Sequence, residues 1–141
     1  MSMSTSAAAP TKSRPEFRNI HVSQIVRYRM PPAAMVSIMH RISGAALFLA
    51  LPFLLWLFDL SLISEGSFDR MAAIGSGWVV KLVLLFLAWG FLHHFVAGIR
   101  YLVLDMHVGL ELPQARRSAL AVYAISLPLT LVAALKLFGA F

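Results

Sequence analysis

The chain of 141 residues contains no cysteine. This absence excludes disulfides, thiolate metal sites, cysteine-ligated iron–sulfur clusters and covalently attached c-type haem on this chain. Charged residues are also scarce, at 13%, whereas hydrophobic residues make up 60%. Soluble domains contain about half apolar and about a quarter charged residues. The composition therefore indicates a membrane protein, in which five histidines are the only strong metal ligands.

Acidic residues are fewer than basic ones, which gives a net charge of +6. The basic residues flank apolar runs, a pattern that favours a membrane surface over nucleic acid as the partner. The sequence also lacks a phosphate-binding loop and any pattern typical of a hydrolase triad. These absences leave binding or redox chemistry within the membrane as the main functional classes.

Three apolar runs have at least the roughly 20 residues that a helix needs to cross a hydrocarbon core of about 30 Å. They cover residues 33–62, 78–105 and 116–139. Residues 1–13 are small, polar and free of acidic groups, which predicts a disordered tail. Residues 14–32 alternate basic and apolar groups, which predicts an interfacial segment on the cytoplasmic surface. The expected fold is an all-α membrane protein with three transmembrane helices.

Basic residues concentrate at one end of the expected bundle. They precede the first run and lie where the second connection meets the third run, at Arg116 and Arg117, whereas the first connection mixes Arg70 with Glu65 and Asp69. The positive-inside rule therefore predicts an N-in, C-out topology. Pro52 and Pro128 fall within runs, where they are expected to bend the helices without ending them.

An unusual set of polar groups opens the first run, in the stretch SIMHRISG. Ser37, His40, Arg41 and Gly44 have the spacing i, i+3, i+4, i+7, which places them on one face of a helix. An ionisable group at the centre of a span costs about 2.5–3.5 kcal/mol on insertion scales. Such a cluster therefore indicates a function.

The second run carries a similar stripe near its end, in the stretch HHFVAGIRYLVLD. His94, Gly98, Tyr101 and Asp105 lie on one helical face, whereas His93 points about 100° away. At about 1.5 Å per residue, the stripes of the two runs lie at similar depth on the same side of the membrane. They are expected to face a shared zone.

The groups in this zone suit a limited range of chemistry. A neutral imidazole ligates haem iron, and arginine or protonated histidine pairs with haem propionates. Serine and arginine can hydrogen-bond the carbonyl oxygens of a quinone and favour the charge that develops on reduction. A polar network that joins the helices is the structural alternative. A site for an anionic or redox ligand accounts better for Arg41 and Arg100 beside the imidazoles.

Together the two stretches resemble the cytochrome b556 membrane-anchor subunits of succinate dehydrogenase, respiratory complex II. The family motifs are S-I-x-H-R-x-[ST]-G in the first helix and H-x-x-x-G-x-R-H-x-x-x-D in the second, and the Arg14-Pro15 dipeptide also fits. The likeness covers about residues 14–135 and includes the three-helix topology. It implies a helical bundle shared with a sister anchor subunit.

The resemblance also implies roles for particular residues. His94 would be the axial ligand of haem b iron, and Ser37 and Arg41 would line the ubiquinone pocket. His40, Arg41 and Tyr101 would approach the haem propionates, with Tyr101 standing where the family has histidine. The sister anchor would supply the second axial ligand, while an iron–sulfur subunit and a flavoprotein subunit would oxidise succinate. The chain would pass electrons from the iron–sulfur subunit to ubiquinone, without a complete active site of its own.

Three alternatives remain open at this point. They are a self-contained b-type cytochrome with His40 and His94 as both ligands, a fumarate reductase anchor, and a non-redox membrane scaffold or small transporter. Stoichiometric haem would separate the first two from the last. The expected location is the bacterial inner membrane, with the mitochondrial inner membrane as the alternative.

Overall fold

In the computed structural model of the chain, residues 21, 23, 27 and 29–140 are described. The expected tail, residues 1–13, lies outside the described residues, as does most of the expected interfacial segment, residues 14–32.

All the regular secondary structure in the described part of the chain is helical. Its elements are α2 (Pro32–Ile63), α3 (Glu65–Gly75), α4 (Trp78–Asp105) and α5 (Leu112–Leu137). Of these, α2, α4 and α5 are long and apolar enough to cross a membrane. The predicted class, an all-α protein with three long apolar helices, is therefore confirmed.

Prolines mark the starts of two long helices. Pro32 lies in the first turn of α2 and Pro113 in the first turn of α5, where a missing backbone N–H costs nothing. The start at Leu112 places the beginning of α5 four residues ahead of the span expected from residue 116. Both helices continue through their internal prolines, Pro52 and Pro128, as expected.

The short helix α3 is an element that the hydropathy pattern does not predict, because its sequence is expected only to connect two spans. It begins with a capping box, in which the backbone N–H of Ser67 donates to Oγ of Ser64 at 3.1 Å. In return the backbone N–H of Ser64 donates to Oγ of Ser67, also at 3.1 Å. The serine pair three residues apart is the sequence signal that could have revealed this helix.

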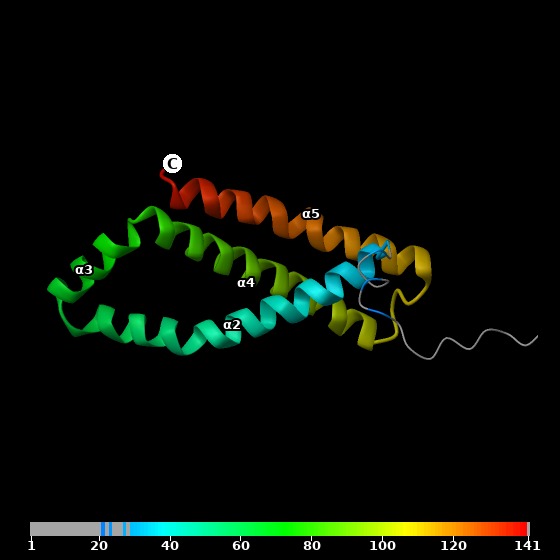
Figure 1. Ribbon diagram of the computed structural model, residues 1–141. Helices are drawn as coiled ribbons and strands as arrows, with labels where there is room; N and C mark the ends of the chain where they lie inside the picture. The colour runs from blue at the N-terminus through cyan, green and yellow to red at the C-terminus, as the bar shows by residue number, and fades with distance from the viewer. Residues whose placement is uncertain (1–20, 22, 24–26, 28, 141) are drawn as a thin grey trace, which may run out of the picture.

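The three long helices pack into a bundle in which α4 contacts both α5 and α2, and the first half of α2 crosses α4 (Figure 1). The helix α3 joins α2 to α4 at one end of the bundle. In the other half of the bundle, Val36 near the start of α2 packs with Ala97 of α4 and Ala119 of α5. This arrangement brings the beginning of α2 beside the second half of α4, where the two polar stripes are located.

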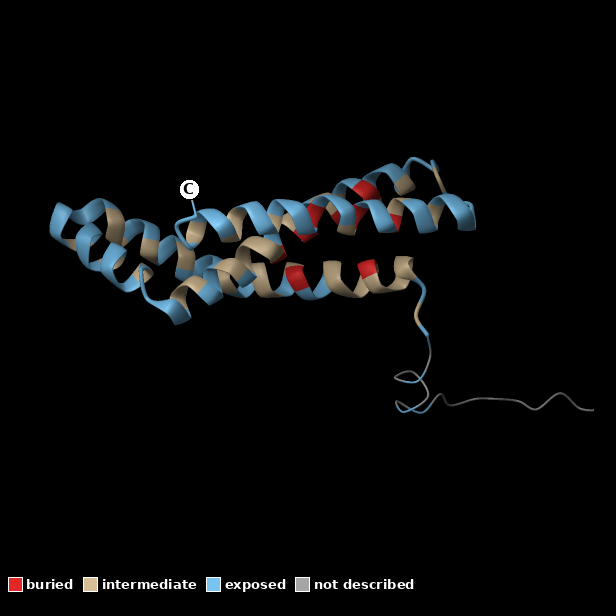
Figure 2. Cartoon of the chain, turned by 90° about the horizontal axis from the view of Figure 1, so that it is seen from above, coloured by how far each residue is buried: buried red, intermediate tan, exposed pale blue. Residues whose placement is uncertain are grey.

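The buried core is small and lies in that same half of the bundle (Figure 2). Its apolar members are Val36, Ala97, Ala119 and Val122, which join all three long helices. Small side chains of this kind let membrane helices approach closely. By contrast, the most apolar stretch of α2 contains no buried residue. The outer faces therefore require lipid or partner helices as their surroundings.

Candidate functional site

The polar stripes of α2 and α4 meet where these helices pack together. The rings of His40 and His94 stack, with centroids 4.1 Å apart and planes within 6° of parallel. The Tyr101 ring centroid lies 5.0 Å from that of His40. The structure thus brings together three of the predicted site residues, one from α2 and two from α4. We call His40 and His94 the histidine stack.

The His94 ring is anchored to α2 through its Nδ1 atom. Nδ1 lies 3.0 Å from the backbone carbonyl oxygen of His40 and 3.3 Å from Oγ of Ser43. The Ser43 hydroxyl donates to the same carbonyl at 3.0 Å. Because a carbonyl oxygen can only accept, the hydrogen bond to His40 requires the proton on Nδ1. The neutral ring then carries its free lone pair on Nε2.

The Nε2 atom of His94 is the candidate ligand atom of the site. It has no hydrogen-bond partner in the described part of the chain, and it is not fully buried. It is therefore accessible to a ligand. Histidines that bind metals usually donate their other ring N–H to a carbonyl or carboxylate, which fixes the tautomer and strengthens the ligand. His94 has this arrangement and therefore fits one axial position of a haem iron.

Ser43 is a site residue that the spacing argument overlooked. It lies three residues after His40, on the same side of α2, and it is buried. Its position within SIMHRISG was visible in the sequence. Its contact with His94, 51 residues away, was not.

Glycine is needed at one position of this contact. A Cβ atom placed on Gly44 would lie only 2.7 Å from Cε1 of His94, so the ring packs directly on the α2 backbone. The corresponding distances are ordinary at the two other glycines of the helix contact. A Cβ atom on Gly98 would lie 3.7 Å from Nε2 of His40, and one on Gly90 would lie 3.9 Å from Cβ of Ser43.

The two predicted quinone residues, Ser37 and Arg41, lie on α2 on either side of His40 in the sequence. Ser37 is half-buried and Arg41 is exposed. Neither side chain forms a hydrogen bond or ion pair with another residue that the structure describes. They therefore lie within about one helical turn of His40 along α2 and form no polar contact with α4.

Tyr101 contributes a hydroxyl that is buried and has no hydrogen-bond partner among the described residues. Buried hydroxyls nearly always have a partner, so an unpartnered one marks a place where a ligand or another subunit could accept a hydrogen bond. The residue lies on the α4 stripe beside His40, as expected from its spacing.

The neighbouring His93 faces the interior of the bundle and not the stack. It is fully buried, and its ring centroid lies 5.7 Å from that of Trp89 and 5.6 Å from that of Tyr123. Both ring nitrogens lack a hydrogen-bond partner within the described residues. Arg100 shares this interior face and turns toward α5. The 100° offset between consecutive helical residues explains why adjacent histidines have such different surroundings.

His40 and His94 are not arranged to share one iron. An imidazole nitrogen binds a metal through a lone pair that lies in the plane of the ring, so two imidazoles that share one iron point their ring edges at it from opposite sides. The His40 and His94 rings instead stack face to face, with centroids 4.1 Å apart and planes within 6° of parallel. No ring lone pair therefore points into the space between them, and His94 is the candidate ligand with His40 beside it.

Fold and site together define a membrane protein with three long apolar helices, in which the His94 ring is held through Nδ1 and leaves Nε2 open. Residues 12–133 match the family described as the succinate dehydrogenase/fumarate reductase transmembrane subunit, and the chain belongs to this family.

Its relatives include succinate dehydrogenase cytochrome b556 subunits from bacteria. That of Paracoccus denitrificans is 33% identical over 111 residues, which cover 79% of this chain and 85% of the relative. That of Coxiella burnetii is 35% identical over 104 residues, which cover 72% of this chain and 82% of the relative. That of Rickettsia bellii is 26% identical over 124 residues, which cover 86% of this chain and 97% of the relative. The resemblance carried by the two sequence motifs is confirmed.

Proposed function

We propose that this chain is a membrane-anchor subunit of a succinate:quinone oxidoreductase, which binds haem b and helps to form the ubiquinone-reduction site. The observation that carries the proposal is the His94 imidazole, whose Nδ1 is held at 3.0 Å from the His40 carbonyl while Nε2 remains open. Membership of the family supports the same function.

In this proposal, His94 holds haem iron through Nε2, and the bound haem supplies an electron carrier within the membrane. The hydrogen bond at Nδ1 orients the ring and increases the basicity of Nε2. His40 and Arg41 would pair with the haem propionates, since both can carry positive charge. The Tyr101 hydroxyl, buried without a partner in the described residues, is available to donate to the same groups.

Ser37 and Arg41 would bind the quinone. Ser37 would donate its hydroxyl to one carbonyl oxygen, and the Arg41 guanidinium would stabilise the negative charge that develops there on reduction. The exposure of Arg41 supports this role because a quinone must enter from the membrane or from a subunit boundary.

The rest of the reaction would take place on partner subunits. A flavoprotein subunit would oxidise succinate, and an iron–sulfur subunit would deliver the electrons to this anchor. A sister anchor subunit would provide the second axial ligand and cover α2, whose most apolar stretch is unburied. The bacterial relatives support a bacterial inner membrane location, with the basic N-terminal end in the cytoplasm.

A fumarate reductase anchor is the second candidate, because the family description covers both enzymes. A self-contained cytochrome that uses His40 and His94 as a ligand pair is disfavoured by the close stacking of these rings. A non-redox scaffold would give no reason for an anchored imidazole with one open nitrogen.

The haem assignment is tested with a matched pair of variants, His94→Phe and His93→Phe, in the purified complex. His94→Phe should abolish or alter the b-type signal in a reduced-minus-oxidised optical spectrum. His93→Phe should preserve it, because the His93 nitrogens make no hydrogen bond in the described structure and phenylalanine has a similar size. A normal spectrum in assembled His94→Phe complex would overturn the assignment.

The quinone assignment is tested with Ser37→Ala and Arg41→Ala. Each should lower succinate-dependent reduction of ubiquinone, while succinate-dependent reduction of an artificial dye persists on the soluble subunits. Equal loss of both activities would place the defect in assembly and contradict the assignment. Comparing succinate oxidation with fumarate reduction in the same preparation separates the two candidate enzymes.

A further inference from the structure

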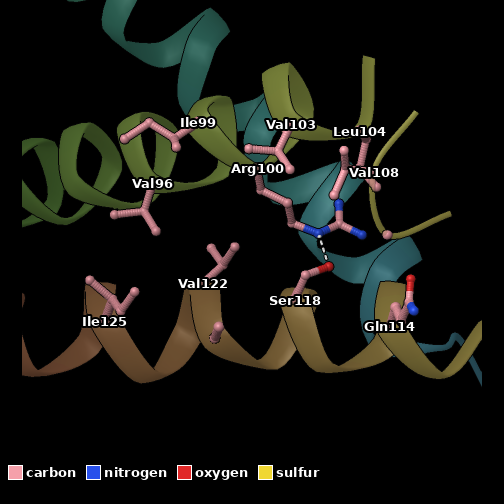
Figure 3. A pocket seen from close by; sticks show the side chains of 12 residues that line it. Val96, Ile99, Arg100, Val103, Leu104, Val108, Gln114, Ser118, Val122 and Ile125 are labelled. Carbon is pink, nitrogen blue, oxygen red and sulfur yellow. Dashed lines mark hydrogen bonds between the residues drawn. The ribbon is translucent and has the colours of Figure 1, made fainter. Parts of the chain in front are cut away.

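A groove of about 550 Å³ lies between α4 and α5, near the connection that joins these two helices. Figure 3 shows Val96 and Ile125 toward one end of the groove and Arg100 and Gln114 toward the other. Most of the lining is aliphatic, and the polar side chains gather at the end near the connection. The groove is thus amphipathic along its length.

The length of the groove corresponds to one leaflet of a bilayer. Its lining on α5 extends from Gln114 to Ile125, a separation of 125 − 114 = 11 residues. At about 1.5 Å per residue this is about 16 Å. Half of a hydrocarbon core of about 30 Å is about 15 Å. An acyl chain that lies along the groove would therefore have its headgroup near the polar end.

The polar end contains a buried cation. Arg100 is only 8% exposed, and its Nε donates to Oγ of Ser118 at 2.9 Å, as Figure 3 shows. Its Nη2 donates to the backbone oxygen of Ala115 at 3.2 Å. The remaining contact is with the Tyr101 ring, whose centroid lies 5.3 Å from the guanidinium carbon.

Two hydrogen bonds use two of the five N–H donors of a guanidinium. Within the part of the chain that the structure describes, no carboxylate pairs with Arg100. Buried charges in proteins are normally paired, because an isolated one is costly in an apolar medium. An anion with several oxygen acceptors would complete this site, and phosphate groups suit the planar fork of arginine.

We propose that this groove binds an anionic phospholipid, with its phosphate on Arg100 and one acyl chain between α4 and α5. The aliphatic lining would hold the acyl chain by apolar contacts, and the unpaired guanidinium would favour an anionic headgroup. Arg116 and Arg117 are exposed on the first turns of α5 and do not line the groove, so Arg100 is the cation of this site. The site involves neither the histidine stack nor the predicted quinone residues, so it goes beyond the proposed function.

Other occupants fit these features less well. A free phosphate ion would use Arg100 but not the apolar lining. A quinone would use the lining but has no charge to neutralise the guanidinium. A partner helix would cover the groove and exclude lipid altogether. Each of these alternatives gives a different result in the experiment below.

The test uses the assembled complex in nanodiscs that contain equal amounts of phosphatidylglycerol and phosphatidylcholine. One lipid at a time carries a photoactivatable group on an acyl chain, and labelled peptides are located by mass spectrometry. In the wild type, phosphatidylglycerol should label the α4 and α5 peptides of the groove several-fold more than phosphatidylcholine. Arg100→Gln should remove most of that preference, so that the two lipids label the groove within about twofold of each other.

Arg117→Gln is the matched control, because it removes the same charge from the same end without lining the groove. It should leave the preference within about twofold of the wild type. Ala121→Phe fills the groove while retaining Arg100, and it should reduce labelling by both lipids. If Arg100→Gln does not assemble, Ala121→Phe decides the matter, since unchanged groove labelling would then overturn the proposal.

Several results would refute a lipid site. Both lipids carry a phosphate, so equal labelling by them in the wild type, or an unchanged preference in Arg100→Gln, would refute the selection of an anionic headgroup by Arg100. An equal loss in Arg117→Gln would indicate diffuse surface charge. Competition by millimolar inorganic phosphate would indicate an ion site, and absence of groove labelling would indicate a covering protein partner.

Discussion

Replacing Gly44 with alanine tests how closely the α2 backbone supports the His94 imidazole. The new Cβ atom would lie 2.7 Å from Cε1 of His94, whereas ordinary contacts begin at 3.4 Å. The ring or the helix must therefore move by 3.4 − 2.7 = 0.7 Å. The ring has little freedom to do so, because its Nδ1 is bonded to the His40 carbonyl and it stacks on the His40 ring.

The magnitude follows from two opposing effects. At an unconstrained helical position, replacing glycine with alanine stabilises a protein by about 0.5–1 kcal/mol, because the unfolded chain loses freedom. Overfilling a packed site costs about 1–3 kcal/mol. At Gly44 the second effect should prevail, with a net cost of about 1–2 kcal/mol. If this cost falls on the position of Nε2, haem affinity should decrease about tenfold.

The control is Gly98→Ala, on the facing helix. Its Cβ atom would meet Nε2 of His40 at 3.7 Å, an ordinary contact, so this variant should be neutral or slightly stabilised. The assay is the haem-to-protein ratio and optical spectrum of the purified complex, together with its thermal stability. The reasoning is refuted if Gly44→Ala retains full haem content and is as stable as Gly98→Ala.

Three further substitutions probe separate contacts. Ser43→Ala should lower thermal stability by about 0.5–1.5 kcal/mol but retain haem, because the His40 carbonyl still holds Nδ1; complete haem loss would contradict this. Ser64→Ala should accelerate hydrogen exchange within α3, since losing a helix cap costs about 1 kcal/mol, and unchanged exchange would show that the capping box is unimportant. Tyr101→Phe should shift the haem midpoint potential in a redox titration while the complex still assembles, and an unshifted potential would remove Tyr101 from the site.

Much of the fold was predictable because membrane insertion depends on local properties of the sequence. Length and hydropathy were sufficient to locate the three long helices, and the prolines at positions 32 and 113 mark two of their starts. The helix α3 was not predicted from hydropathy. Its first turn is organised by hydrogen bonds between Ser64 and Ser67, which a search for apolar runs does not detect.

The candidate site was predictable only in part. Helical periodicity correctly predicted that His93 and His94 lie on different faces of α4. It also correctly predicted that His94 and Tyr101 lie in the same zone as His40. It could not show that Ser43 reaches His94, because the contact depends on how two helices cross. The roles of Ser37 and Arg41 remain predictions.

The sequence alone determined that this chain is a membrane protein and which family it resembles, because hydropathy, charge distribution and motif spacing are properties of single segments. Only the tertiary structure decided which nitrogen of His94 carries the proton, since that depends on a carbonyl 54 residues away. It also decided that Arg100 turns to Ser118 beside an apolar groove. Such contacts depend on the relative position of helices, which no periodicity within one helix can specify.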